Sequence, residues 1–164
     1  MRILRLTAAL LLIGTATATA APTTETIKSR ADGTNIVVSV YKPAGASAAN
    51  PAPVILQSHG WGGTRTSSDG AFATELGKGY GVVSIDQRGH GDSGGEANIE
   101  DPEFEGQDMI SVIDFVAAQD WVAKDPGRPN DPVLFAMGGS YGGGFQYVAA
   151  FTELRDLGYT RLNA

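Results

Sequence analysis

The sequence of 164 residues contains no cysteine and only two histidines, His59 and His90. The absence of cysteine excludes disulfides, thiolate-bound zinc and a thiol nucleophile. Lysine and arginine are also scarce, at 12 against 18 acidic residues, and no basic cluster is present to neutralise phosphates or anionic lipids. We therefore expect no role in binding nucleic acid or a membrane surface.

Long hydrophobic runs are missing as well. The apolar stretch 6–13 is much shorter than the roughly 20 residues that cross a bilayer, which argues against the alternative of a membrane anchor. Two arginines precede this stretch and small residues follow it at 18–20, an order typical of a secretory signal peptide. We predict that residues 1–20 are a signal peptide. The mature chain, residues 21–164, is then secreted or periplasmic and has no stable membrane anchor.

The remaining sequence has the composition of one globular domain, with 42% apolar and 18% charged residues. Asp32-Gly33 between two β-branched runs predicts a hairpin, and short apolar runs bounded by glycine or proline predict buried strands. The expected strands are 24–30, 34–41, 54–57, 80–86 and 133–137, and the expected helices are 68–78, 101 to about 121, and 145–157, with a break at 126–132. Strands that alternate with helices in this way predict an α/β fold with a mostly parallel sheet and helices on both faces.

Three polar, glycine-rich segments follow three of the predicted strands. They are residues 59–63, 86–93 and 138–142. In open parallel sheets, ligands bind outside the carboxyl ends of the strands. We therefore expect the functional site where these three segments meet.

Ser140 is the candidate nucleophile. It occupies the centre of a Gly-x-Ser-x-Gly sequence between a predicted strand and a predicted helix, a turn that exposes the serine hydroxyl. Residues two positions away must be very small to avoid a clash, and Gly138 and Gly142 meet that requirement. The alternative is a glycine-rich turn with no reactive group.

Two backbone N–H groups are candidates for an oxyanion hole. The N–H of Tyr141 directly follows the candidate nucleophile at the positive end of a helix, and the N–H of Trp61 follows the neighbouring strand. Gly60 allows the backbone beside Trp61 to come close. The alternative interpretation is a plain loop that carries a hydrophobic tryptophan.

Other patterns in the segment 86–94 favour simpler explanations. Residues 89–94 spell Gly-x-Gly-x-x-Gly, but no helix is predicted after them, so we expect a turn rather than a dinucleotide site. Asp86, His90 and Asp92 include a single histidine, and we predict no metal site. Arg88 is expected to hold its loop through a carboxylate or carbonyl contact.

Together these motifs resemble the α/β-hydrolase superfamily, and within it the branch of X-Pro dipeptidyl-peptidases and cocaine esterases. The motifs are the hairpin around Asp32-Gly33, His-Gly-Trp-Gly-Gly at 59–63, Asp-x-Arg-Gly-x-Gly-x-Ser at 86–93 and Gly-Gly-Ser-Tyr-Gly-Gly at 138–143. The resemblance implies an α/β-hydrolase fold and a Ser-His-Asp triad that cleaves esters or amides, including peptides. It implies Ser140 as nucleophile, the Tyr141 N–H in the oxyanion hole, and neither a metal nor an organic cofactor.

The sequence departs from this family after Ser140. The family order is serine, then acid, then histidine, yet the residues after Ser140 include Glu153 and Asp156 and no histidine. Family position makes His59 a loop-shaping residue and places His90 in a turn, so we expect neither to be the general base.

This departure leads us to expect the N-terminal part of a longer hydrolase, truncated after the helix that follows Ser140. The strand before Ser140 would then form an exposed sheet edge. The alternative is a non-catalytic remnant that binds a ligand or partner without turnover, or that fails to fold.

Overall fold

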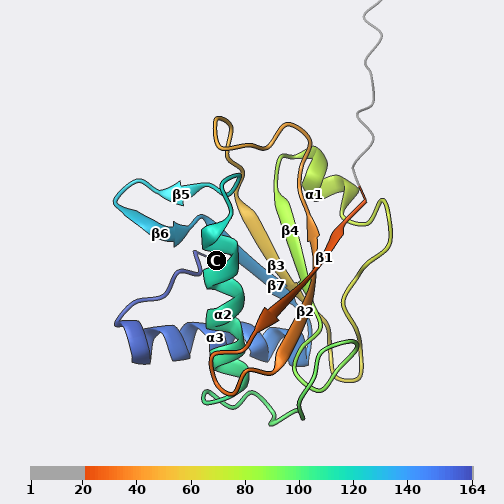
Figure 1. The fold of residues 1–164 in the computed structure, drawn as a ribbon, viewed down its shortest axis with the longest axis vertical. Coiled ribbons are helices and arrows are strands. Elements are labelled where there is room, and N and C mark those ends of the chain that lie inside the picture. Colours follow the sequence, from red (N-terminus) through yellow and green to blue (C-terminus); the bar gives the residue numbers. More distant parts are fainter. Residues whose placement is uncertain (1–20, 164) are drawn as a thin grey trace, which may run out of the picture.

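The computed structural model describes residues 21–163 (Figure 1). The predicted signal peptide, residues 1–20, lies outside these described residues. Among the helices of the described part, none combines the length and apolar character needed to cross a membrane.

A five-stranded mixed sheet forms the centre of the molecule, with strand order β1-β2-β4-β3-β7. Its strands are β1 (Thr23–Lys28), β2 (Asn35–Tyr41), β3 (Val54–Ser58), β4 (Gly81–Ile85) and β7 (Leu134–Gly138). β3 is parallel to both β4 and β7, whereas β2 pairs antiparallel with β1 and with β4. All five residues of β4 are buried, as expected of a short apolar strand inside a sheet.

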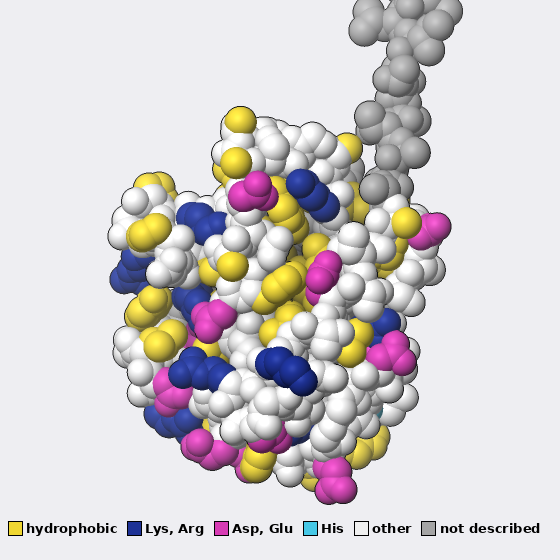
Figure 2. All heavy atoms as spheres, viewed as in Figure 1, with side chains coloured by type: hydrophobic (Ala, Val, Ile, Leu, Met, Phe, Trp, Pro, Cys, Tyr) yellow, Lys and Arg dark blue, Asp and Glu magenta, His cyan; other side chains and the backbone are white. Residues whose placement is uncertain are grey.

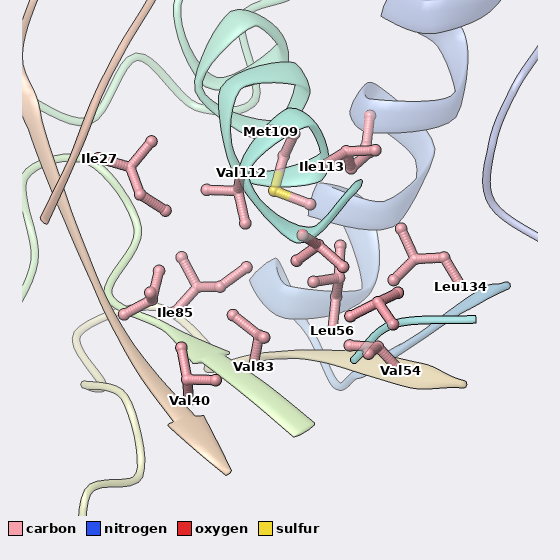
Figure 3. Packing of buried hydrophobic residues seen from close by; sticks show 14 of the residues in the cluster. Ile27, Val40, Val54, Leu56, Val83, Ile85, Met109, Val112, Ile113 and Leu134 are labelled. Carbon is pink, nitrogen blue, oxygen red and sulfur yellow. The ribbon is translucent and has the colours of Figure 1, made fainter. Parts of the chain in front are cut away.

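Helices cover both faces of this sheet. α2 (Glu105–Ala118) and α3 (Tyr141–Leu157) pack on one face, and the short α1 (Ala73–Gly77) packs on the other. In Figure 3, Met109, Val112 and Ile113 of α2 point toward apolar side chains of the strands. The predicted α/β arrangement, in which helices cover both faces of a central sheet, is confirmed.

Three predicted elements differ from the observed ones. The segment expected as a break is a small antiparallel hairpin, β5 (Lys124–Asp125) with β6 (Arg128–Pro132), and the N–H of Gly127 donates to the Asp125 side chain in its turn. α1 is shorter than 68–78 because Phe72, just before it, has a left-handed backbone with φ 58°. α3 begins at Tyr141 rather than at 145, so the glycines after Ser140 are helical.

β7 lies at the edge of the sheet. Its inner side pairs with β3, and on its outer side only Leu162 begins a parallel bridge, opposite Leu134. Asn163 extends this contact, because its backbone N–H donates to the Leu134 carbonyl at 2.8 Å. Among the residues that the structure describes, nothing else pairs with the outer side of β7, so the strand before Ser140 is the exposed edge that the sequence predicts.

The surface carries charges of both signs in close proximity. On the face shown in Figure 2, acidic and basic side chains are interleaved instead of gathering into one basic region. Arg155, for example, forms ion pairs with Glu103 and Asp156.

Candidate functional site

The loops that leave β3, β4 and β7 meet at the carboxyl edge of the sheet. Ring contacts between them show this directly: the centroid of Trp61 lies 5.1 Å from that of Tyr141 and 5.2 Å from that of His90. The centroids of His90 and Tyr141 are 5.8 Å apart. The three segments that the sequence singles out are therefore brought together.

Ser140 sits in an unusual backbone conformation between β7 and α3. Its φ is 55° and its ψ is −124°, whereas residues other than glycine rarely adopt a positive φ. The Ser140 carbonyl accepts the N–H groups of Gly143 and Gly144, at 2.8 and 3.1 Å, so the helix begins immediately after it. The turn is therefore abrupt, and Ser140 is exposed at its tip.

The glycines on either side of Ser140 are required by close backbone contacts. A Cβ at position 138 would lie 2.6 Å from the Gly142 carbonyl oxygen, and one at position 142 would lie 2.6 Å from the Ser58 carbonyl oxygen. Because these obstacles are backbone atoms, no side-chain rotation relieves them. Gly60 also lies beside Ser140, but a Cβ there would be 3.7 Å from the Ser140 Cβ, an ordinary contact.

The backbone N–H groups of Trp61 and Tyr141 have no hydrogen-bond acceptor in the described part of the chain. Tyr141 is the first residue of α3, and the N–H groups of a first helical turn have no acceptor within their own helix. The positive end of the helix dipole adds to the attraction of this position for an anion.

His59 is fully engaged in holding two loops together. Its Nδ1–H donates to the Gly60 carbonyl at 2.8 Å, and its Nε2 accepts the Gln87 backbone N–H at 3.1 Å. The Gln87 side chain also donates to the His59 carbonyl, at 2.8 Å. With both ring nitrogens occupied and only 7% of its surface exposed, His59 has no lone pair available to accept a proton from Ser140.

His90 has a different environment. Its Nδ1–H donates to the Arg88 carbonyl at 3.0 Å, and its ring packs between the rings of Trp61 and His59. Within the described residues, no hydrogen bond joins His90 to Ser140.

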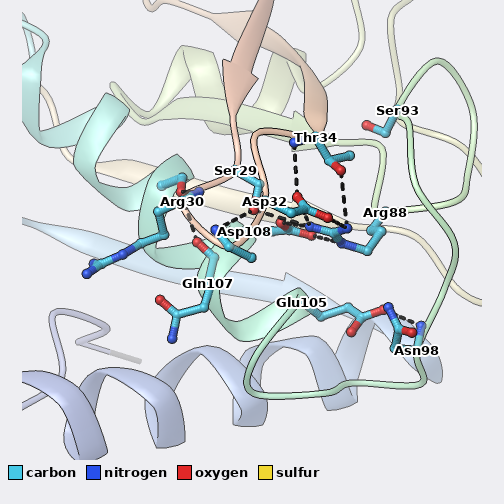
Figure 4. Close-up of polar contacts among 12 residues, drawn as sticks. Ser29, Arg30, Asp32, Thr34, Arg88, Ser93, Asn98, Glu105, Gln107 and Asp108 are labelled. Carbon is cyan, nitrogen blue, oxygen red and sulfur yellow. Dashed lines mark hydrogen bonds and ion pairs between the residues drawn. The ribbon is translucent and has the colours of Figure 1, made fainter.

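Arg88 anchors the loop after β4 in a buried polar network (Figure 4). Only 2% of the residue is exposed, and its guanidinium forms paired hydrogen bonds with both Asp108 of α2 and Asp32 of the β1–β2 turn. The hydrogen bonds from Arg88 to Asp32 hold the pKa of the Asp32 carboxyl well below its usual range, and a hydrogen bond from the Thr34 backbone N–H adds to this effect. Arg88 therefore fixes its loop through carboxylates, as predicted.

The Asp86 carboxylate is committed to a similar role. It is fully buried and accepts the backbone N–H groups of Arg65 and Asp92, at 2.6 and 2.9 Å, while also pairing with the Arg65 guanidinium. Across residues 21–163 there is no group of three or more potential metal ligands.

Two acidic residues support the first turn of α3, and the sequence did not predict their role. Glu105 is fully buried and accepts the N–H groups of Asn98 and Asp101, at 2.6 and 3.0 Å. Glu100, in the loop held this way, has φ 62° and lies against Gly144 in the first turn of α3. Burial, and secondly the charge of Glu105, raises the pKa of Glu100. No local motif in the sequence signals this packing.

The Tyr141 hydroxyl is buried and has no hydrogen-bond partner of normal geometry within the described residues. Burial, followed by the negative charge of Glu105, raises the pKa of Tyr141 to about 12, although the nearby Glu100 backbone opposes the shift. The phenol is therefore neutral at physiological pH, and its ring serves as packing beneath the site.

Solved structures of hydrolases share this fold. They include the acetyl xylan esterase from Paenibacillus sp. R4 (25% identity, TM-score 0.60, covering 75% of this chain and 42% of that one). A putative dipeptidyl aminopeptidase IV from Bacteroides ovatus matches at 25% identity and TM-score 0.59, over 85% of this chain and 20% of that one. Est1E from Butyrivibrio proteoclasticus, solved with ferulic acid bound, matches at 18% identity and TM-score 0.58, over 83% and 49%. This chain thus spans less than half the length of each.

No curated protein matches the sequence. The family model described as X-Pro dipeptidyl-peptidase (S15 family) matches residues 32–159. That range begins within the β1–β2 turn and takes in all three loops of the site and the whole of α3, so this chain belongs to the X-Pro dipeptidyl-peptidase (S15) family, whose fold is that of the α/β-hydrolases.

Proposed function

We propose that this chain provides the nucleophile and the oxyanion-stabilising groups of a serine hydrolase that cleaves ester or amide bonds, peptide bonds included. The observation that carries the proposal is the strained conformation of Ser140 at the end of β7, with φ 55°. In the reaction, Ser140 Oγ attacks the substrate carbonyl carbon while its proton passes to a general base. The alcohol or amine then leaves with a proton, and water hydrolyses the acyl-serine.

The oxyanion is stabilised in this proposal by the N–H groups of Tyr141 and Trp61. Both are unoccupied within the described residues, and they come from neighbouring loops that touch through their rings at 5.1 Å. Donors fixed in this way need little rearrangement as charge develops on the carbonyl oxygen. Each such donor typically contributes about 3 kcal/mol to the transition state.

The general base is proposed to lie outside these 164 residues. No histidine follows Ser140 in the sequence, His59 uses both ring nitrogens, and His90 makes no hydrogen bond to Ser140 in the described part of the chain. We therefore propose that the catalytic aspartate and histidine come from further polypeptide.

Labelling with a fluorophosphonate tests the role of Ser140. We expect slow modification of Ser140, found by mass spectrometry of the digested chain, and acceleration by added imidazole, which supplies the missing base. Ser140→Ala should abolish the labelling, while Ser47→Ala, at another exposed serine, should leave it unchanged. Absence of labelling at Ser140 even with imidazole would favour a non-catalytic binding module.

Residues 1–20 are proposed to direct this protein out of the cytoplasm, to the periplasm or the medium, and to be removed there. Expression with and without this segment tests the proposal. Cell fractionation and N-terminal sequencing should find an exported chain that begins near residue 21, whereas a chain retained with its original N-terminus would contradict the proposal.

A further inference from the structure

His90 belongs to the segment 86–93, a motif that the proposed chemistry does not use. Its ring nevertheless touches the candidate site from the loop after β4. The ring centroid lies 5.2 Å from Trp61 and 5.8 Å from Tyr141, the two residues whose N–H groups are the proposed oxyanion donors. The ring of His59 packs on another side, at 5.1 Å.

His90 is itself held firmly. Its backbone N–H donates to the Gln87 carbonyl at 2.9 Å, its carbonyl accepts the Ser93 N–H at 3.0 Å, and its Nδ1–H donates to the Arg88 carbonyl. The side chain of Arg88 is in turn fixed by Asp108 and Asp32. The His90 ring therefore projects from an anchored loop, whose position is set by α2 and by the β1–β2 turn.

The His59–Gln87 hydrogen bonds hold the base of the Trp61 loop, but the Trp61 indole projects from it. The residue is 60% exposed, and the aromatic contacts of its indole are edge-to-face packing on His90, at an interplanar angle of 84°, and on Tyr141, at 80°. The three rings thus form a triangle in which each touches the other two. Removing the His90 ring leaves the Trp61 indole with one aromatic contact, that with Tyr141.

We propose that His90 is a positioning residue of the oxyanion hole: its ring fixes the Trp61 loop relative to the start of α3 and so sets the spacing of the two N–H donors. The proposal rests on the proposed function for the identity of those donors. The contacts with Trp61 and Tyr141 are ring packing, and the hydrogen bond from Nδ1–H to the Arg88 carbonyl lies within the loop of His90, so the proposal assigns the spacing to the shape of the ring. A misplacement of about 1 Å among catalytic groups can reduce a rate by a factor of about a hundred.

Two variants separate ring packing from nitrogen chemistry. His90→Ala removes the ring, whereas His90→Phe keeps a ring and removes both nitrogens. We expect His90→Ala to slow imidazole-assisted fluorophosphonate labelling of Ser140 by about tenfold to a hundredfold. His90→Phe should stay within a factor of about three of the unsubstituted chain, since it retains the packing.

Tryptophan fluorescence reports the geometry independently of any chemistry. The chain has two tryptophans, and Trp121 is only 5% exposed, so acrylamide mainly quenches Trp61. Trp61→Phe should abolish the quenchable component and verifies the assignment. We expect His90→Ala to shift Trp61 emission to longer wavelength and to increase its quenching by acrylamide. His90→Phe should give emission and quenching close to those of the unsubstituted chain. Both variants should retain the far-ultraviolet circular dichroism of the unsubstituted chain.

Two results would overturn the proposal: unchanged Trp61 fluorescence in His90→Ala, or loss of labelling in His90→Phe equal to that in His90→Ala, which would assign the role to a nitrogen. If the unsubstituted chain is not labelled, the proposed function fails, yet the fluorescence of the two variants still decides whether His90 positions the Trp61 loop.

Discussion

Gly142 and Gly139 lie on either side of Ser140, but their surroundings differ. A Cβ at position 142 would lie 2.6 Å from the Ser58 carbonyl oxygen, whereas a Cβ at position 139 meets nothing within 4 Å. We expect Gly142→Ala to lower the free energy of unfolding by about 1–3 kcal/mol, because the turn must move away from β3. Gly139→Ala should change it by less than about 0.5 kcal/mol. Urea unfolding measures both, and equal losses would contradict the contact geometry.

Asp32 makes the stability of the hairpin depend on pH. Hydrogen bonds from Arg88 hold the pKa of this carboxyl below its unfolded value of about 4, so folding favours the charged form. The contribution is fully present above the unfolded pKa and is lost as pH falls toward the lower folded pKa. We expect Asp32→Asn to reduce the slope of unfolding free energy against pH below about pH 5. An unchanged acid slope in this variant would show that the Arg88 contact contributes no proton linkage.

Among the elements, the first turn of α3 contains two glycines with opposite requirements. At Gly143 a Cβ would lie 3.5 Å from the Gly138 carbonyl oxygen, an ordinary contact, but at Gly144 it would overlap the Glu100 carboxylate. Since alanine favours helices over glycine by about 1 kcal/mol, Gly143→Ala should stabilise the chain by about that amount.

Gly144→Ala should gain less than Gly143→Ala, because the new methyl group displaces Glu100. In a Glu100→Ala background the benefit of Gly144→Ala should appear, and a double-mutant cycle from thermal unfolding measures this coupling. Equal effects of Gly144→Ala in both backgrounds would contradict it.

The sequence predicts those elements whose pattern is local. Short apolar runs located β3, β4 and β7, and the rule for parallel sheets placed Ser140 near the Trp61 loop. The start of α3 could not be predicted, because glycines at 142–144 disfavour a helix and only the Ser140 carbonyl and the packing against β3 impose one. The packing of the Trp61, His90 and Tyr141 rings could not be predicted either, since it joins segments far apart in the chain. The hydrogen bonds that Glu105 accepts from the loop before α2 have no local sequence motif.

For the molecule as a whole, the absence of a histidine after Ser140 predicted an exposed sheet edge at β7. It did not predict which side chains lie exposed beside that edge. The outer face of α3 carries large apolar side chains at helical spacing: Tyr147, Phe151, Leu154 and Leu157 are 81%, 55%, 57% and 40% exposed. A groove of about 440 Å³ lies between α3 and β7, lined in part by Tyr147, Ala136 and Leu162. We call these four α3 residues the apolar stripe. Within the described residues nothing covers the stripe.

An uncovered apolar stripe beside an unpaired strand favours association between chains. We expect the chain to self-associate at micromolar concentrations, and sedimentation velocity should show a sedimentation coefficient that rises with concentration. Replacing Tyr147 by Glu and Leu154 by Lys should shift the chain toward monomer with little change in melting temperature, because both side chains are exposed.

The matched control is Ile99→Lys, at an apolar residue that is 73% exposed but belongs to the loop before α2 and not to α3. This variant should associate like the unsubstituted chain, because it leaves the stripe and the β7 edge intact. Equal relief of association by Ile99→Lys would show that general surface hydrophobicity is responsible. A chain that remains monomeric at all concentrations would show that residues 21–163 tolerate the open edge without a partner.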